Sequence, residues 1–365
     1  MIFPTNLAKH FVLPESYVLG VLVDYLSPAI YLIEILAAVL LVFSLGKLKR
    51  LVGPPRTLFL LSFIFWLSLL PSVVSGGFSL ISLWRWGELA LWLGFGVWVA
   101  RFISWKQHSR ITLFLGIAVV WVSFLALAQF AFQHSILGYW FLGEPELSPS
   151  LGGVALGSWG GREVLRAYGT FPHPNVLGGV LSVVLVWLAA RRLWVSFGVG
   201  AAAVIVSLSK TAWLSLLGGL SLLFARFGLG VILPWSDLSV TRRIELLGSA
   251  AAMVGNSPLT GVGLGQFTQA LPSFGVPSGL SLFIQPVHNV FALIAAESGL
   301  FALLAFLALL FFAFRQTLRE RRWLLTISLL QIVFLGMFDH YFYTLPQGLL
   351  LFGLTLGLSF GYSDN

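Results

Sequence analysis

Apolar runs about as long as a bilayer is thick dominate the sequence. A hydrocarbon core about 30 Å thick requires roughly 20 apolar residues in a helix. The runs that fit this length lie at residues 28–46, 57–74, 83–101, 111–131, 174–190, 193–208, 211–226, 289–314, 323–338 and 346–361. We therefore predict an all-α fold, a polytopic bundle of about 10–12 transmembrane helices.

Basic residues fall in the short segments between these runs. Clusters such as Arg191 with Arg192 follow alternate runs. Because cytoplasmic loops of membrane proteins are enriched in Lys and Arg, these clusters place segments 132–173 and 237–287 on the external face. That topology needs one further crossing at residues 227–236, which are apolar but too few for an ordinary spanning helix. We predict a short, tilted or broken crossing there.

The same pattern divides the chain into two parts. Residues 1–160 are predicted to hold the N-terminal transmembrane helices and the first external loop. Residues 161–365 hold the remaining helices and the external loop 237–287, the most polar long segment of the chain. Within this loop we predict a helix over 241–255, followed by an irregular stretch rich in Gly and Pro.

Composition supports a membrane protein and excludes other classes. Hydrophobic residues make up 58% of the chain and charged residues only 9%, whereas soluble domains average about 25% charged residues. The net charge of +8 could indicate a nucleic-acid partner, but the basic residues cluster beside apolar runs, so the expected partner is the lipid bilayer. The chain has no cysteine, which excludes disulfides and thiolate metal sites.

Polar residues gather near the predicted external ends of the helices. The candidates are Arg166, His173, Asn175, Lys210, Arg242, Arg243, His288, Asn289, Asp339 and His340. Several cations around a histidine suit a substrate that carries phosphate, because Arg offers a planar fork and Lys a point charge to phosphate oxygens. No spacing of His, Asp and Glu predicts a metal site, and none predicts a Ser-His-Asp triad.

Each of these features also has a purely structural interpretation. An Arg at a helix end commonly extends toward lipid headgroups, and Asn289 can simply cap the helix that follows it. The glycine run 261–265 resembles a phosphate-binding loop, but it follows no predicted strand, so that interpretation is weak. Arg85 and Glu88 are spaced to pair with each other on one helix.

Five segments in order carry a resemblance to a known family. They are LRAYGTFPHPNVLGG at 165–179, SLSKTAWLSLL at 207–217, RIELLGSAAAMVGNSPLTGVGLGQF at 243–267, HNVFALIAAESGLFALLAF at 288–306 and FDHYFYTLPQGLLLFGLTLGL at 338–358. Together they resemble the O-antigen ligase and O-antigen polymerase superfamily. The resemblance covers roughly 165–361, whereas the first 160 residues match only in hydropathy. The chain departs from the family at Lys210, where the family has Arg, and in the compressed segment 227–236.

The resemblance implies a GT-C-like fold and an inverting, metal-independent glycosyltransferase of the inner membrane, without a cofactor. Such enzymes move a glycan from undecaprenyl pyrophosphate to lipid A-core, another glycan or a protein on the periplasmic face. The resemblance does not distinguish a ligase from a polymerase. Carried over to this chain, His288 and Arg243 are the catalytic candidates, and Arg166, Lys210 and Arg242 join Arg243 as pyrophosphate ligands. The secondary candidates are His173, Asn175, Asn289, Asp339 and His340.

The competing hypothesis is a flippase for lipid-linked oligosaccharides or another membrane transporter. A carrier is expected to place ionisable residues deep within its spans, or to contain broken helices in paired halves. Here Glu34 is the clearest charge within a predicted span, and the other polar residues gather on one face. This distribution favours the enzyme. A purely structural membrane partner would leave the external basic residues unexplained.

Overall fold

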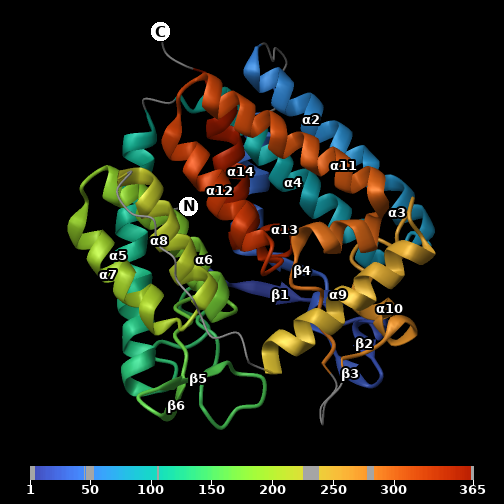
Figure 1. Cartoon of the computed structure of the whole chain (residues 1–365), viewed down its shortest axis with the longest axis horizontal. Coiled ribbons are helices and arrows are strands. Elements are labelled where there is room, and N and C mark those ends of the chain that lie inside the picture. The colour runs from blue at the N-terminus through green and yellow to red at the C-terminus, as the bar shows by residue number, and fades with distance from the viewer. Residues whose placement is uncertain are drawn as a thin grey trace.

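The protein is mostly helical, as Figure 1 shows. The computed structural model describes residues 5–44, 46, 53–104, 107–224, 238–277 and 283–362. The helices are α1 (Leu32–Ser44), α2 (Pro54–Ser68), α3 (Leu70–Ser75), α4 (Leu80–Phe102), α5 (His108–Phe132), α6 (Pro174–Ala190), α7 (Trp194–Val206), α8 (Lys210–Phe224), α9 (Leu238–Asn256), α10 (Phe267–Phe274), α11 (Val290–Arg319), α12 (Trp323–Gly336), α13 (Tyr341–Thr344) and α14 (Pro346–Phe360). Two short 3₁₀ helices, Pro14–Ser16 and Asp24–Leu26, lie in the N-terminal segment.

Each predicted apolar run coincides with one or two of these helices. In the described part of the chain, three helical segments are long and apolar enough to cross a membrane: Pro54–Ser75, His108–Phe132 and Val290–Arg319. Six shorter apolar helices, α1, α6, α7, α8, α12 and α14, cover most of the other predicted runs. The chain is therefore a membrane protein candidate by helix length and composition. The predicted crossing at 227–236 lies outside the described residues.

Helices α12 and α14 lie between two groups of helices, one that contains α4 and α11 and one that contains α6 and α8 (Figure 1). Helix α14 packs against α4, α6 and α11, and α12 packs against α6 and α8. Small residues allow the closest contact: a Cβ added at Gly357 would lie 2.5 Å from the carbonyl oxygen of Gly96 in α4. Since lipid is as apolar as the helix surfaces, such close backbone contacts are a main source of helix association in a membrane.

The prediction of a mainly helical fold is confirmed, but three small antiparallel pairs of strands that were not predicted interrupt it. β1 (Ala8–His10) pairs with β4 (Ala29–Tyr31), β2 (Tyr17–Val18) with β3 (Val21–Leu22), and β5 (Leu156–Trp159) with β6 (Arg162–Leu165). Strands of two to four residues carry too little alternation for a sequence pattern to reveal them.

The segment predicted to be external contains more helix than its sequence pattern predicts. The helix predicted over 241–255 is confirmed as α9. The stretch after it was predicted to be irregular, but α10 forms there with Pro272 inside it. Phe267, Thr268 and Leu271 are buried on one face of α10, which packs against α9 and α11. Burial of this face outweighs the helix-breaking tendency of the proline.

The glycine run 261–265 fits into a break in α11 and is not a phosphate-binding loop. The backbone N–H groups of Val262 and Gly263 donate to the carbonyls of Ala296 (2.9 Å) and Glu297 (3.1 Å). Gly299 interrupts the helix with a φ of 80°, which leaves these carbonyls available. A phosphate cradle needs free N–H groups, whereas here two of them are used within the protein.

We predict that Gly261→Ala destabilises the protein. Gly261 has a φ of +66°, and an added Cβ would lie 2.2 Å from the backbone of Glu297. The unfavourable backbone conformation alone costs about 1–3 kcal/mol, so the temperature of thermal unfolding in detergent should fall clearly. Gly248→Ala is the matched control, because no atom lies within 4 Å of its added Cβ and Ala favours a helix. An equal response of both variants would contradict this account of the loop.

Candidate active site

Histidine, carboxylate and arginine side chains meet where three separate segments of the chain end. Asp339 and His340 lie between α12 and α13, and His288 lies just before α11. Arg243 reaches this place from α9 and donates through Nη1 to the carbonyl of Phe338 at 2.8 Å. One side-chain N or O atom from each of His288, Asp339 and His340 lies within 4.8 Å of the other two.

Asp339 is the carboxylate at the centre of this cluster. Its Oδ1 accepts from the backbone N–H of His340 at 2.8 Å, and its Oδ2 accepts from Nδ2 of Asn175 at 3.2 Å. Burial would raise the pKa of Asp339, but His288, His340 and Arg243 outweigh burial and lower that pKa to about 2. The carboxylate is therefore ionised at neutral pH and attracts cations.

Arg166 binds Asn175, the residue whose side chain donates to Asp339. Its Nη2 donates to Oδ1 of Asn175 at 2.7 Å, and its Nε donates to the carbonyl of Ser207 at 2.8 Å. Burial lowers the pKa of Arg166 to about 10, and Arg243 adds to this effect. Arg166 is still a cation at neutral pH, and through Asn175 it links Asp339 to the end of α7.

Helix caps fix the entry to two of the helices around the site. His173 caps α6, because its Nδ1 accepts from the backbone N–H of Asn175 at 3.1 Å. Asn289 caps α11 by accepting from the N–H of Ala292 at 2.9 Å, which confirms the capping role considered for it. Burial, with Arg166 next in effect, lowers the pKa of His173 to about 3, so this ring is neutral and free to act as an acceptor.

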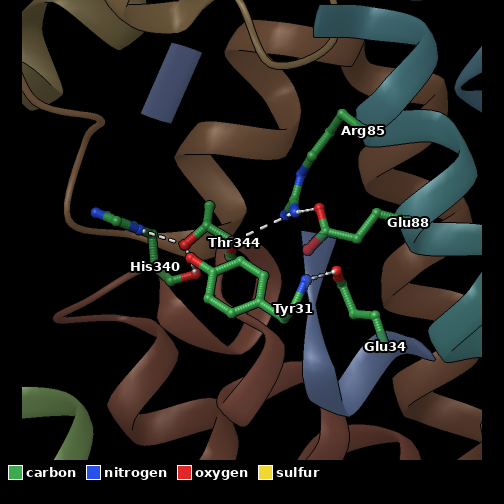
Figure 2. A network of polar contacts seen from close by, with 6 residues as sticks. All are labelled: Tyr31, Glu34, Arg85, Glu88, His340 and Thr344. Atoms are coloured by element: carbon green, nitrogen blue, oxygen red, sulfur yellow. Dashed lines mark hydrogen bonds and ion pairs between the residues drawn. The ribbon is translucent and has the colours of Figure 1, made fainter. Parts of the chain in front are cut away.

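The contacts of His340 define its tautomer. Thr344 Oγ1 lies 2.7 Å from His340 Nδ1 and donates its only proton to the carbonyl of His340 at 3.1 Å. Because the hydroxyl proton is already used, Nδ1 must carry a hydrogen and donate it to Thr344. The lone pair of His340 is therefore on Nε2, which points away from Thr344 in Figure 2.

A network of charged side chains from the first helices contacts the backbone of Thr344 (Figure 2). Arg85 in α4 donates to the carbonyl of Thr344 at 3.4 Å and forms an ion pair with Glu88, as predicted from their spacing. Glu34 in α1 accepts from the backbone N–H of Tyr31 at 3.0 Å and contacts Glu88. This network connects the first helices of the chain to His340.

Aromatic contacts continue the site toward α9. Tyr25 lies edge-on to His340 at 5.2 Å, His340 edge-on to His288 at 5.4 Å, and Phe283 parallel to His288 at 6.5 Å between ring centres. The guanidinium of Arg242 lies over the Phe283 ring, 4.9 Å from its centre. A cation on an aromatic face is stabilised by the ring quadrupole. Arg242 therefore borders the site through Phe283.

His288 is positioned to accept a proton. Burial lowers its pKa, Asp339 opposes this effect, and Arg243 adds to it. Burial also lowers the pKa of His340 to about 3, against the opposing effect of Asp339. Both imidazoles are therefore neutral at pH 7 and each has a lone pair. Two neutral histidines beside one carboxylate and two arginines can take up a proton and can bind an anion.

The predicted site residues come together with one exception. The exception is Lys210, which is exposed at the start of α8 and makes no hydrogen bond or ion pair with the cluster in the described part of the chain. Sequence reasoning missed Tyr25, Phe283 and Thr344, which contact the histidines. Nothing in the spacing of these residues indicates a site, because common aromatic and hydroxyl residues occur throughout the chain.

No protein-family model matches the sequence, and a search of curated proteins finds no significant match.

We predict that Thr344→Val destabilises the protein by about 1–3 kcal/mol, because the buried Nδ1–H of His340 loses its acceptor. Thr355→Val is the matched control: the Thr355 hydroxyl only returns to the carbonyl of Leu351 in its own helix. Thermal unfolding in detergent measures both changes. A loss for Thr355→Val as large as that for Thr344→Val would contradict the hydrogen bond assigned to His340.

Proposed function

We propose that the protein is a polytopic membrane glycosyltransferase of the O-antigen ligase or polymerase type. It would move a glycan from undecaprenyl pyrophosphate to a hydroxyl of lipid A-core, another glycan or a protein. The expected place is the external face of the bacterial inner membrane, with about 10–12 spans in a GT-C-like arrangement. The five ordered sequence segments support this proposal, and ligase and polymerase are equally compatible with it.

The observation that carries the proposal is the meeting of Arg243 and Arg166 with two neutral histidines around Asp339. These groups lie at the ends of apolar helices, and in this proposal the diphosphate of the membrane lipid binds beside them. A lipid diphosphate needs cations beside a hydrocarbon environment. A sugar acceptor needs a base, and the histidine lone pairs provide one.

The proposed reaction is an inverting displacement at the anomeric carbon of the glycan. The acceptor oxygen forms a bond to this carbon while the bond from the carbon to the diphosphate oxygen breaks. His288 takes the proton that the acceptor hydroxyl loses, and Asp339 stabilises the resulting imidazolium. Arg243 and Arg166 offset the extra negative charge on the departing diphosphate, an effect that is larger in a poorly hydrated site.

One observation favours the transporter as a second candidate. Glu34 and Arg85 are buried within helices, and Arg85 pairs with the partly buried Glu88. Ionisable residues inside a membrane usually mark a pathway for ions or substrates. However, this network contacts the carbonyl of Thr344 and so supports His340 through that residue. A fluorescent lipid-diphosphate-linked glycan in sealed vesicles separates the two candidates. A carrier would move this probe to the other leaflet, whereas a transferase would remove the glycan from it.

We predict that Arg243→Ala raises the KM for the lipid-linked donor by about 10- to 100-fold, because a hydrogen bond to a charged group contributes about 1.5–3 kcal/mol. Arg243→Lys should recover only part of the affinity, since Lys lacks the planar fork. Arg162→Ala, at an exposed position in β6, is the control and should leave the KM unchanged. The assay is glycan transfer by purified protein. An unchanged KM in Arg243→Ala would remove this residue from the donor site.

We predict that His288→Ala lowers the rate of transfer by about 10²- to 10⁴-fold, the usual contribution of a positioned base. The KM for the donor should change little, because Arg243 and Arg166 still bind the diphosphate. His288→Gln should be equally slow, since an amide can form a hydrogen bond but cannot take up the proton. His134→Ala, in an exposed loop, is the control. Normal turnover by His288→Gln would assign His288 to orientation of the acceptor only.

A further inference from the structure

The cluster of His288, Asp339 and His340 has a second chemical capacity besides accepting a proton. The three residues offer two imidazole nitrogens and a carboxylate oxygen, all within 4.8 Å of one another. This donor set is common in sites for divalent transition metals such as Zn²⁺. The cluster joins residues about fifty positions apart, so no spacing in the sequence could predict it.

The hydrogen bonds around the three residues resemble those that support metal ligands. Metal-binding histidines commonly use their other nitrogen as a donor to a neighbouring group, which fixes the ring. His340 donates from Nδ1 to Thr344 and keeps the Nε2 lone pair available. Asp339 is oriented by Asn175 and by the N–H of His340.

His288 provides an independent indication of a missing partner. Its Nδ1 is buried and has no hydrogen-bond partner among the described residues. A buried polar atom without a partner costs free energy and calls for a ligand, a proton or a water. The His288 ring lies edge-on to His340, with 5.4 Å between the ring centres.

We propose that His288, Asp339 and His340 bind one divalent transition-metal ion of the Zn²⁺ class, and that the bound ion inhibits glycan transfer. Binding itself does not depend on the proposed function, whereas inhibition rests on it. A metal bond to His288 occupies the lone pair that would otherwise take the acceptor proton. Release of the ion restores the base.

The charges and dimensions of the cluster set limits on this binding. Nitrogen and oxygen ligands of tetrahedral Zn²⁺ lie about 3.4 Å apart, given bond lengths near 2.0–2.1 Å. Any pair of ligand atoms that lies beyond this separation, up to the 4.8 Å limit of the cluster, closes in by side-chain rotation when the ion binds. Arg243 is close to Asp339 and repels a cation, so we expect moderate affinity and reversible binding. Mg²⁺ and Ca²⁺ should bind poorly, because they prefer ligand sets made of oxygen alone.

Titration of the purified full-length protein with Co²⁺ tests the site directly. Visible absorption bands of protein-bound Co²⁺ report coordination, and displacement by Zn²⁺ gives the affinity for Zn²⁺. We expect one equivalent of Co²⁺ in the wild type and an affinity at least 10-fold lower in His288→Ala and in Asp339→Asn. Asp339→Asn preserves the shape of the side chain, and thermal unfolding verifies that both variants fold. His134→Ala is the control and should bind as the wild type does.

The outcomes separate this inference from the proposed function. Wild-type protein without Co²⁺ bands, or equal binding in both cluster variants, would overturn the metal site. If Zn²⁺ binds at the cluster but transfer continues at full rate, the site stands and the inhibition is wrong. If no lipid-linked glycan is transferred under any condition, the proposed function fails while the Co²⁺ titration still decides the metal site.

Discussion

A carboxylate that lies among apolar helices must be surrounded by cations or hydrogen-bond donors, and Asp339 obtains them from distant parts of the chain. Asn175 comes from the start of α6, Arg243 from α9, and His288 from the segment before α11. Removal of one partner from a buried charge pair typically costs about 3–5 kcal/mol. The position of this one charge therefore constrains how the ends of three helices meet.

The helices can be predicted from the sequence because a helix that spans a bilayer needs a long run of apolar residues, and such a run is easy to recognise. Runs of apolar residues predict the helices from 28–46 to 346–361 within a few residues, as α1 and α14 illustrate. The candidate residues were found by the same reasoning, since charged or imidazole side chains stand out against an apolar background. Arg243, His288 and Asp339 were visible in this way, and the i, i+3 spacing of Arg85 and Glu88 predicted their ion pair.

Other features depend on contacts between segments that are remote in sequence, and local patterns do not encode these. Tyr25 and Phe283 flank the histidines only because the N-terminal segment and the segment before α11 fold onto the same helix ends. The glycines at 261–265 match the break at Gly299 in α11 for a comparable reason. The sequence also indicated Lys210 as a site residue, although this side chain is exposed at the start of α8.

The N-terminal segment has a consequence for the order in which the protein is assembled. The carbonyl of Thr5 accepts from Gln347 in α14 at 3.2 Å, and the N–H of Asn6 donates to the carbonyl of Leu142 at 3.0 Å. Thr5 and Asn6 thus make these contacts with residues that are translated much later. Until α14 is synthesised, the nascent chain holds Thr5 and Asn6 without the Gln347 side chain that joins them to that helix. The N-terminal segment therefore reaches its final set of contacts only when α14 is in place.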